Sequence, residues 1–209
     1  MLSKKTAARE KFDRWAGTYE RDRRSRFNAR PQRAALAALG LRPGDRFLDV
    51  GCGTGAAVRA AAAVVERAVG VDLSPEMVNR ARELARESPD AEFVVGDSEE
   101  LPFPDGAFTA LLCTSSFHHY PEPWRALAEM ARVLAVGGRF VLADGTSDRF
   151  VARIADGLLR RFDRGHVRLY RSDELVERIR AAGFDEIAVR AMWDGGYVIV
   201  SARRGVWKQ

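Results

Sequence analysis

The sequence predicts an α/β fold in which a mostly parallel sheet is covered by helices on both faces. Three observations indicate this fold. Short, almost continuously apolar segments alternate with helical segments from residue 46 onward, as in sheets that are buried on both faces. A glycine-rich bend, LDVGCGTG at residues 48–55, joins the first strand to a helix. Two later strands are separated only by residues 194–196, which predicts a hairpin and therefore one antiparallel strand.

The elements follow in order from these patterns. Residues 6–19 predict a first helix, because Phe12, Trp15 and Tyr19 lie at helical spacing. A charged connector at residues 21–26 leads to a second helix, from about residue 30 to residue 39. The predicted strands are residues 46–50, 68–72, 92–95, 108–114, 139–143, 187–193 and 197–203. The later helices are residues 54–65, a helix capped by Ser74, residues 123–134, and a helix capped by Ser172 that reaches residue 182.

The composition is that of an ordinary globular protein, with 46% hydrophobic and 30% charged residues. No apolar run reaches the roughly 18 residues of a membrane span, and residues 1–15 lack the apolar core of a secretory signal, so we expect a cytoplasmic location. The formal net charge is +5, but acidic residues are interspersed with the basic ones, so no nucleic-acid partner is expected. Cys52 and Cys113 are the only cysteines, which predicts neither a disulfide framework nor a zinc site.

The glycine-rich bend is a candidate ligand site. Gly51 and Gly53 permit positive φ and let a ligand approach the backbone, and N–H groups at the start of the next helix favour an electron-rich group. The spacing Gly51-x-Gly53-x-x-Ala56, with Asp72 further on, also fits a dinucleotide-binding fingerprint. A P-loop is excluded because no Gly-Lys-Ser/Thr follows. A tight turn without any ligand would use the same glycines.

Three acids at the ends of successive strands bear on these alternatives. Asp49 lies inside the bend, Asp72 ends the second strand, and Asp97 follows the third. A carboxylate two residues before Gly51 suits a ligand with positive charge better than a pyrophosphate. Asp97 and Ser98 offer hydrogen-bonding groups for an adenine. The set therefore predicts a site for a cationic nucleoside.

Four motifs as a set, LDVGCGTG, VGVDLSPEMV, GDSEELPFPDGAF and RVLAVGGRFVLAD, resemble those of class I S-adenosylmethionine-dependent methyltransferases. The resemblance covers about residues 34–144 and, in outline, the closing hairpin. FDRWAGTYE also resembles the small-molecule branch that includes the quinone-biosynthesis C-methyltransferases, in which this helix folds over the cofactor. One departure is Val136, where a proline often precedes the paired glycines.

The resemblance implies a Rossmann-like class I methyltransferase fold, with a seven-stranded sheet of order 3-2-1-4-5-7-6 and strand 7 antiparallel. Residues 1–40 would form an N-terminal helical cap. Residues 41–209 would form the methyltransferase domain and include a lid segment at residues 146–171.

The resemblance also implies a cofactor site, with S-adenosyl-L-methionine as cofactor and S-adenosyl-L-homocysteine as product. Asp49, Gly51 and Gly53 would lie at the methionyl part, and Asp72 would hold the ribose hydroxyls. The other implied contacts are Leu73 and Met77 against the adenine, Asp97 and Ser98 at its edge, Thr114 or Ser115 on the methionyl side, and Tyr19 closing the pocket.

Methyl transfer from a sulfonium requires alignment of the two reactants and exclusion of water, and it requires a base only if the acceptor must lose a proton. His118 and His119 are the candidate bases, and His166 is a candidate acceptor contact. Each also fits a purely structural role, and no metal is predicted. The leading hypothesis is a methyltransferase that acts on a small-molecule acceptor. The alternatives are a nicotinamide-dependent oxidoreductase and a cofactor-binding protein without transferase activity.

Overall fold

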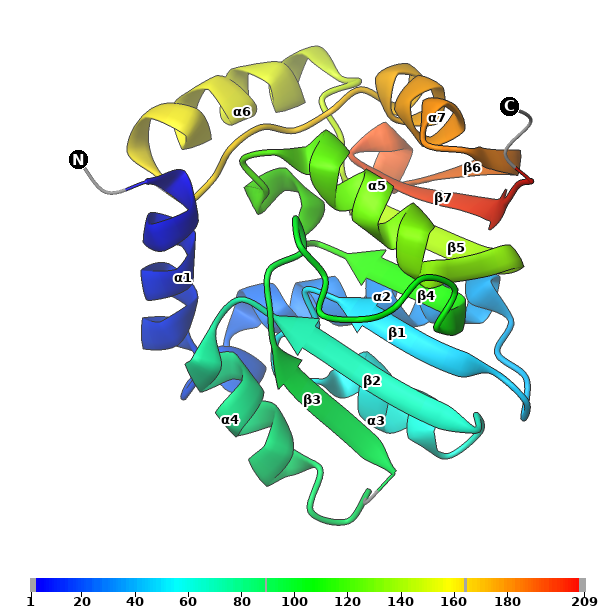
Figure 1. Ribbon diagram of the computed structural model, residues 1–209. Helices are drawn as coiled ribbons and strands as arrows, with labels where there is room; N and C mark the ends of the chain where they lie inside the picture. The colour runs from blue at the N-terminus through cyan, green and yellow to red at the C-terminus, as the bar shows by residue number, and fades with distance from the viewer. Residues whose placement is uncertain (1–2, 89, 164, 207–209) are drawn as a thin grey trace.

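A seven-stranded sheet forms the centre of the molecule (Figure 1). The computed structural model describes residues 3–88, 90–163 and 165–206, and of residues 23–28 it describes the backbone alone. The strands are β1 (Arg46–Val50), β2 (Arg67–Asp72), β3 (Ala91–Val95), β4 (Phe108–Thr114), β5 (Leu134–Gly145), β6 (Phe184–Met192) and β7 (Tyr197–Arg204). Their order is β3-β2-β1-β4-β5-β7-β6, and β7 runs antiparallel to both of its neighbours. The predicted fold and strand order are therefore confirmed.

Helices cover both faces of the sheet. They are α1 (Lys4–Trp15), α2 (Arg23–Leu39), α3 (Ala56–Ala62), α4 (Pro75–Leu84), α5 (Pro123–Val133), α6 (Phe150–Phe162) and α7 (Ser172–Ala181), with short 3₁₀ turns η1 (Tyr19–Arg21), η2 (Phe117–His119) and η3 (Trp193–Gly195). Successive side chains of a strand point to opposite faces. Thus Phe47 of β1 packs with α2, α3 and α4, whereas Leu48 packs with α5 and α7.

Several helix ends differ from the sequence-based expectations. The predicted connector at residues 21–26 lies partly within α2, which begins at Arg23 and continues through Pro31. Helix α3 begins only at Ala56, because Gly55 before it has left-handed geometry with φ +78°. Ser172 is the first residue of α7 rather than its cap, and its backbone N–H and hydroxyl both donate to Asp148. Ser74, in contrast, caps α4 as predicted.

The glycine bend is fixed to the neighbouring strand. The backbone N–H groups of Gly51 and Cys52 both donate to the carbonyl of Val71 at the end of β2. Gly51 has φ +76°, and a Cβ there would lie 2.5 Å from the Oγ of Ser116. The bend is therefore closely packed on the protein side, and only glycine fits at its first position.

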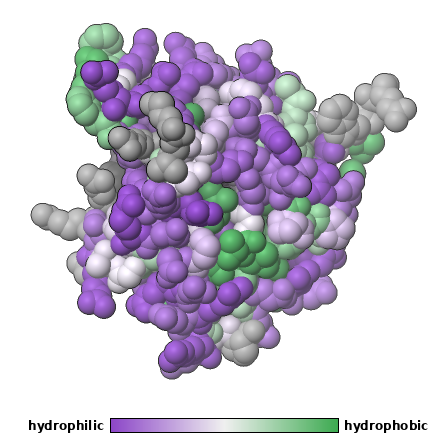
Figure 2. All heavy atoms as spheres, turned by 60° about the vertical axis from the view of Figure 1, so that its left-hand side comes forward, coloured by the Kyte–Doolittle hydropathy of each residue, from purple (hydrophilic) through white to green (hydrophobic). Residues whose placement is uncertain are grey.

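Helices α1 and α6 lie beyond the carboxyl ends of the strands rather than on a face of the sheet (Figure 1). Helix α6 lies near α1 at this end of the molecule (Figure 1), and Asp156 is the single buried residue among its described side chains. Its outer face exposes large apolar side chains, namely Phe150, Val151, Ile154, Leu158 and Phe162. The face of the molecule in Figure 2 is mostly hydrophilic, with apolar patches near its centre and at its upper left. Among the described helices, none is both long and apolar enough to cross a membrane.

Candidate cofactor and active site

A cavity lies at the carboxyl ends of β1 to β4, under α1. Most of the side chains predicted for the site line it: Tyr19, Gly51, Gly53, Asp72, Leu73, Met77, Asp97, Ser98, Thr114, Ser115 and His119. Asp49 lies buried behind the bend, and neither His118 nor His166 is among the lining residues. In parallel α/β sheets this edge is where ligands bind, because the strand ends and helix starts converge there.

Asp72 organises the centre of the cavity. Its carboxylate accepts hydrogen bonds from the backbone N–H of Gly53 (2.8 Å) and from that of Ser74 (2.9 Å). Burial raises the pKa of Asp72, and the backbone hydrogen bonds oppose that shift. Gly53 has φ +53°, and a Cβ built on it would meet no protein atom within 4 Å. The backbone at Gly53 therefore faces open space beside a fixed carboxylate.

Asp49 is buried without a hydrogen-bond partner. Within the described residues, its two carboxylate oxygens are the only buried side-chain oxygens or nitrogens that no group satisfies. Burial, with a smaller contribution from the charge of Asp72, raises its pKa to about 8. Leaving such a group unpaired costs free energy, so the arrangement favours a ligand that brings positive charge or a hydrogen-bond donor to this position.

Asp97 lies at the adenine side of the predicted site, and the N-terminal helix reaches it. Lys5 of α1 donates to Asp97 at 2.6 Å and also pairs with Glu99. The carboxylate of Asp97 additionally accepts from the backbone N–H of Glu99. Glu99 is buried and accepts from the backbone N–H of Glu122. The loop after β3 is therefore held in place by α1 and by the segment that starts α5.

Thr114 and Ser115 end β4 on the opposite side of the cavity. Ser115 has φ +52°, a conformation that non-glycine residues seldom adopt and that is common at functional sites. It is held there because its N–H donates to the carbonyl of Ala143 and its hydroxyl bonds the hydroxyl of Tyr197 at 2.8 Å. Thr114 bonds the side chain of Gln32 from α2.

Phe12 of α1 and Tyr19 of η1 line the cavity, and Trp15 packs against both of them. Phe12 stacks on Trp15, and Trp15 packs edge-on against Tyr19 at 4.7 Å between ring centroids. Burial raises the pKa of Tyr19 to about 12, and the charges of Asp72 and Asp49 contribute to the shift. Tyr19 is therefore a neutral phenol at physiological pH, and it lies within electrostatic range of both acids.

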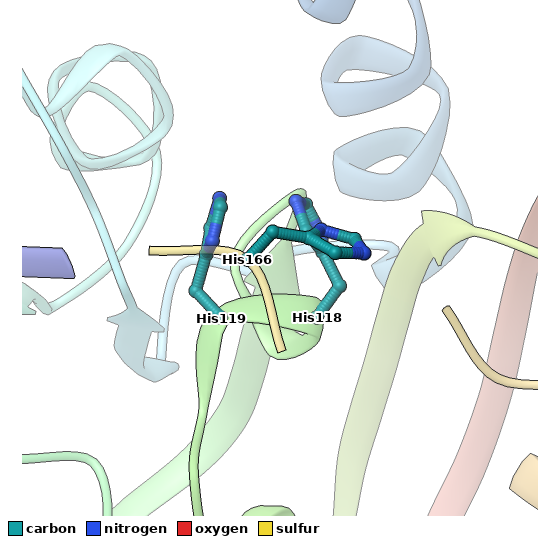
Figure 3. A group of neighbouring side chains, drawn as sticks. All are labelled: His118, His119 and His166. Atoms are coloured by element: carbon teal, nitrogen blue, oxygen red, sulfur yellow. The ribbon is translucent and has the colours of Figure 1, made fainter. Parts of the chain in front are cut away.

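The three histidines of the chain lie together beside this cavity, as Figure 3 shows. His118 and His119 belong to η2, and His166 comes from the segment after α6. His118 Nδ1 lies 2.7 Å from Asp144, His119 Nδ1 lies 2.6 Å from the carbonyl of Gly165, and His166 Nε2 lies 2.7 Å from Asp156. Burial lowers the pKa of His119 well below its ordinary value and also lowers that of His166. Both rings are therefore neutral at physiological pH.

Several groups at the site were not predicted from the sequence. They include Lys5 and Phe12 of α1, Asp13, whose carboxylate accepts from the hydroxyl of Ser74, and the two aspartates that bind histidines, Asp144 and Asp156. Asp144 could have been predicted from the sequence, because it lies next to the end of β5 as Asp49 lies next to the end of β1. The others depend on how distant helices pack, which no local pattern reveals.

Comparison with known proteins agrees with this geometry. The model of a methyltransferase domain family matches residues 48–142, the part that contains the bend and all three acids. The 27-O-demethylrifamycin SV methyltransferase of Amycolatopsis mediterranei is 37% identical over 153 residues, which are 70% of this chain and 56% of that protein. A demethylmenaquinone methyltransferase of Beutenbergia cavernae is 40% identical over 113 residues, which are 54% of this chain and 46% of that protein. The chain thus spans about half the length of these relatives.

Solved structures share the fold. The crystal structure of the YcgJ protein from Bacillus subtilis superposes with a TM-score of 0.76 at 22% identity, over 86% of this chain and all of that one. At this level of identity the likeness concerns the fold alone.

Proposed function

We propose that this protein transfers the methyl group of S-adenosylmethionine to a small-molecule acceptor. The proposal starts from two findings: residues 48–142 match the model of a methyltransferase domain family, and the sheet has the strand order of the class I S-adenosylmethionine-dependent enzymes. The nicotinamide-dependent alternative is not favoured, because the family match covers the same glycine bend on which that alternative depended.

The unsatisfied carboxylate of Asp49 carries the proposal. S-adenosylmethionine has a sulfonium and an ammonium group, so it brings positive charge to a site whose buried acid lacks a partner. A dinucleotide would instead bring a pyrophosphate towards Asp49 and Asp72, and the like charges would repel. The residues present therefore fit S-adenosylmethionine.

Each remaining cofactor contact has a distinct task in this proposal. Asp72, already oriented by two backbone N–H groups, accepts from the ribose hydroxyls, and Gly53 lets the cofactor pass close to the backbone. Leu73 and Met77 pack against the adenine, and Asp97 with Ser98 binds its edge. Lys5, which pairs with Asp97, neutralises that carboxylate and orients it.

When bound, S-adenosylmethionine supplies an electrophilic methyl group on a sulfur that leaves as a neutral thioether. The protein aligns the acceptor with that methyl group and excludes water, which is where most of the rate enhancement of such a displacement arises. Phe12, Trp15 and Tyr19 perform the second task by covering the cavity. We assign the cap to α1 and η1, because α2 packs on the sheet with Phe47 and Leu112. The lid is residues 146–171.

The acceptor enters at the histidine side of the cavity. His119 is the histidine that lines the cavity, and it stacks edge-on against Phe12. His118 and His119 are the candidate bases where the acceptor must lose a proton and no other group occupies their ring nitrogens, and His166 is a candidate acceptor contact. An acceptor of the demethylmenaquinone or demethylrifamycin kind fits the names of the two relatives and the aromatic wall.

Calorimetric titration with S-adenosylmethionine and with S-adenosylhomocysteine tests the proposal. We expect micromolar dissociation constants for both nucleosides and a severe loss of affinity in Asp72→Ala. Labelled cofactor and a panel of phenolic and quinone acceptors then report methyl transfer. Absence of heat with both nucleosides would overturn the proposal, whereas binding without transfer across the panel would favour a cofactor-binding protein that is not an enzyme.

A pair of glycine variants separates binding from folding in this test. Gly53 and Gly40 both have positive φ and open space around a built Cβ, but only Gly53 lines the cavity. Alanine at either position costs about 1 kcal/mol of stability through backbone strain. We expect Gly53→Ala to weaken cofactor binding at least tenfold and Gly40→Ala to leave it unchanged. Equal affinities in the two variants would place the cofactor elsewhere.

A further inference from the structure

The histidine cluster has the hydrogen-bonding arrangement of a metal site. One ring nitrogen from each of His118, His119 and His166 lies within 4.8 Å of the other two. His119 and Gly165 are 46 positions apart in the sequence, yet the two segments are joined by backbone hydrogen bonds from Val167 and Arg168 to the carbonyl of His118. The cluster is therefore built by tertiary structure, which explains why sequence spacing predicted no metal.

The partners of the three rings fix their tautomers. A carboxylate and a carbonyl can only accept, so His118 and His119 donate from Nδ1, and His166 donates from Nε2. The second nitrogen of each ring makes none of these bonds: Nε2 of His118, Nε2 of His119 and Nδ1 of His166. Within the described part of the chain, no donor is recorded for any of these nitrogens. A cation held between the three rings would take the lone pair of one nitrogen from each ring.

The outer partners match those of metal-binding histidines. Such histidines donate their second ring N–H to a carboxylate or a backbone carbonyl, which fixes the ring and raises its basicity. Asp144 also accepts from the backbone N–H of His118, and Asp156 also accepts from the backbone N–H of Leu169, so both carboxylates are held firmly. Lys11, whose charge reaches His119, is paired with Asp163. The surrounding charge therefore favours a cation.

We propose that His118, His119 and His166 bind one divalent transition-metal ion, zinc in the first instance. Three imidazoles without a directly coordinating carboxylate suit zinc better than magnesium or calcium. Tetrahedral zinc with bonds of about 2.0–2.1 Å holds its nitrogen ligands about 3.4 Å apart. Closing the present separations to that value needs ring movements of about 1 Å. Three protein ligands leave a position open, as in catalytic zinc sites.

The open position gives the metal a role that rests on the proposed function. His119 lines the cavity, so the ion lies at its acceptor side. An acceptor hydroxyl bound there loses its proton to water at a lower pH than in solution. Its oxygen then forms the bond to the methyl carbon as the carbon–sulfur bond breaks and sulfur keeps the electron pair. The acceptor class this predicts is a phenol, hydroquinone or enol.

Cobalt(II) absorption tests the site without any assay of activity. We expect the chelator-treated protein to bind one Co²⁺ with a visible band typical of nitrogen ligation, and Zn²⁺ to displace it. We expect His166→Ala to abolish the band. If this buried substitution prevents folding, the variant His118→Gln, at a more exposed position, takes its place and should weaken Co²⁺ binding at least tenfold. Since the chain has no other histidine, a band that survives His166→Ala, or no stoichiometric band in the wild type, overturns the proposal.

A second pair of variants tests the outer partners. Asp156→Asn keeps the shape of the side chain and should lower metal affinity by about 10- to 100-fold. Asp173→Asn, on the exposed start of α7, is the matched control and should change nothing. Equal affinity in the two variants contradicts the assignment of Asp156. Cofactor titration on the same preparations tests the two proposals separately. Loss of nucleoside binding would contradict the proposed function and not the metal site, and loss of the cobalt band would contradict the metal site and not the cofactor site.

Discussion

Buried Asp49 lowers the stability of the protein when no cofactor is bound. Its pKa is raised to about 8 from an ordinary value of 3.8, chiefly by burial. Because the folded state holds the proton more tightly than the unfolded state, this residue lowers the free energy of unfolding progressively as pH rises from about 4 to about 8. A neutral asparagine of the same shape does not carry this cost.

We therefore predict that Asp49→Asn is more stable than the wild type in the absence of cofactor, by several degrees in Tm at pH 8. The difference should shrink towards zero near pH 4, where both side chains are neutral. The same variant should bind S-adenosylmethionine at least tenfold more weakly. Thermal unfolding across this pH range measures the first effect, and calorimetry at one pH measures the second. A variant less stable than the wild type at pH 8 would contradict this account.

At the scale of residues, the strand-end acids could be predicted and their supporting groups could not. Parallel strands bring their carboxyl ends to one edge, so Asp49, Asp72 and Asp97 had to lie near one another. Lys5, in contrast, reaches Asp97 only because α1 crosses the open end of the sheet. No spacing in the sequence encodes that crossing.

Helix α1 is fastened over the cavity by a few polar contacts. Asp13 accepts from the hydroxyl of Ser74 at the start of α4, and Lys11 pairs with Asp163 beyond α6. Few of its residues are buried, Ala8 among them, so most of its side chains add little to global stability. Such a segment opens locally at a smaller cost than unfolding of the core.

We predict that Asp13→Ala increases the rate of cofactor dissociation several-fold, because the helix opens more often, while Tm falls by only a few degrees. Stopped-flow displacement, followed by tryptophan fluorescence, measures the rate, since Trp15 packs beside the cavity. Arg14→Ala, at an exposed position of the same helix, is the control and should leave the rate unchanged. Equal rates in the two variants would mean that α1 does not limit exchange.

At the scale of elements, strands were easier to predict than helix ends. A buried strand is read from its apolar residues, and β7 and β4 match their predicted bounds within one residue. Two predicted starts were wrong: β5 begins at Leu134 rather than at residue 139, and β6 begins at Phe184 rather than at residue 187. The start of α2 was missed because its first turn is rich in arginine, which helices tolerate as well as connectors do. The predicted helix at residues 54–65 also ends early, because α3 stops at Ala62.

The whole molecule should respond to cofactor as one cooperative unit. The cavity draws its lining from α1, from the ends of β1 to β4 and from η2, so a ligand that fills it would contact residues from Lys5 to Pro121. A ligand that binds only the folded state at 100 times its dissociation constant stabilises it by about 2.7 kcal/mol. For a chain of this length that corresponds to a rise in Tm of roughly 5–10 °C.

We predict this rise for S-adenosylhomocysteine, with circular dichroism and tryptophan fluorescence reporting the same single transition. Asp72→Ala should show no rise at the same ligand concentration. Two separate transitions, of which only one moves with ligand, would show instead that the cap unfolds independently of the sheet.

The antiparallel strand has a consequence for synthesis of the protein. Strand β7 enters the sheet between β5 and β6, although its residues are the last of the seven strands to be made. As the chain emerges from the ribosome, β1 to β5 can pair while the outer edge of β5 still lacks its partner. That apolar edge stays open to pairing with other chains until residues 197–204 arrive. The growing chain is thus most prone to aggregation shortly before its sheet is complete.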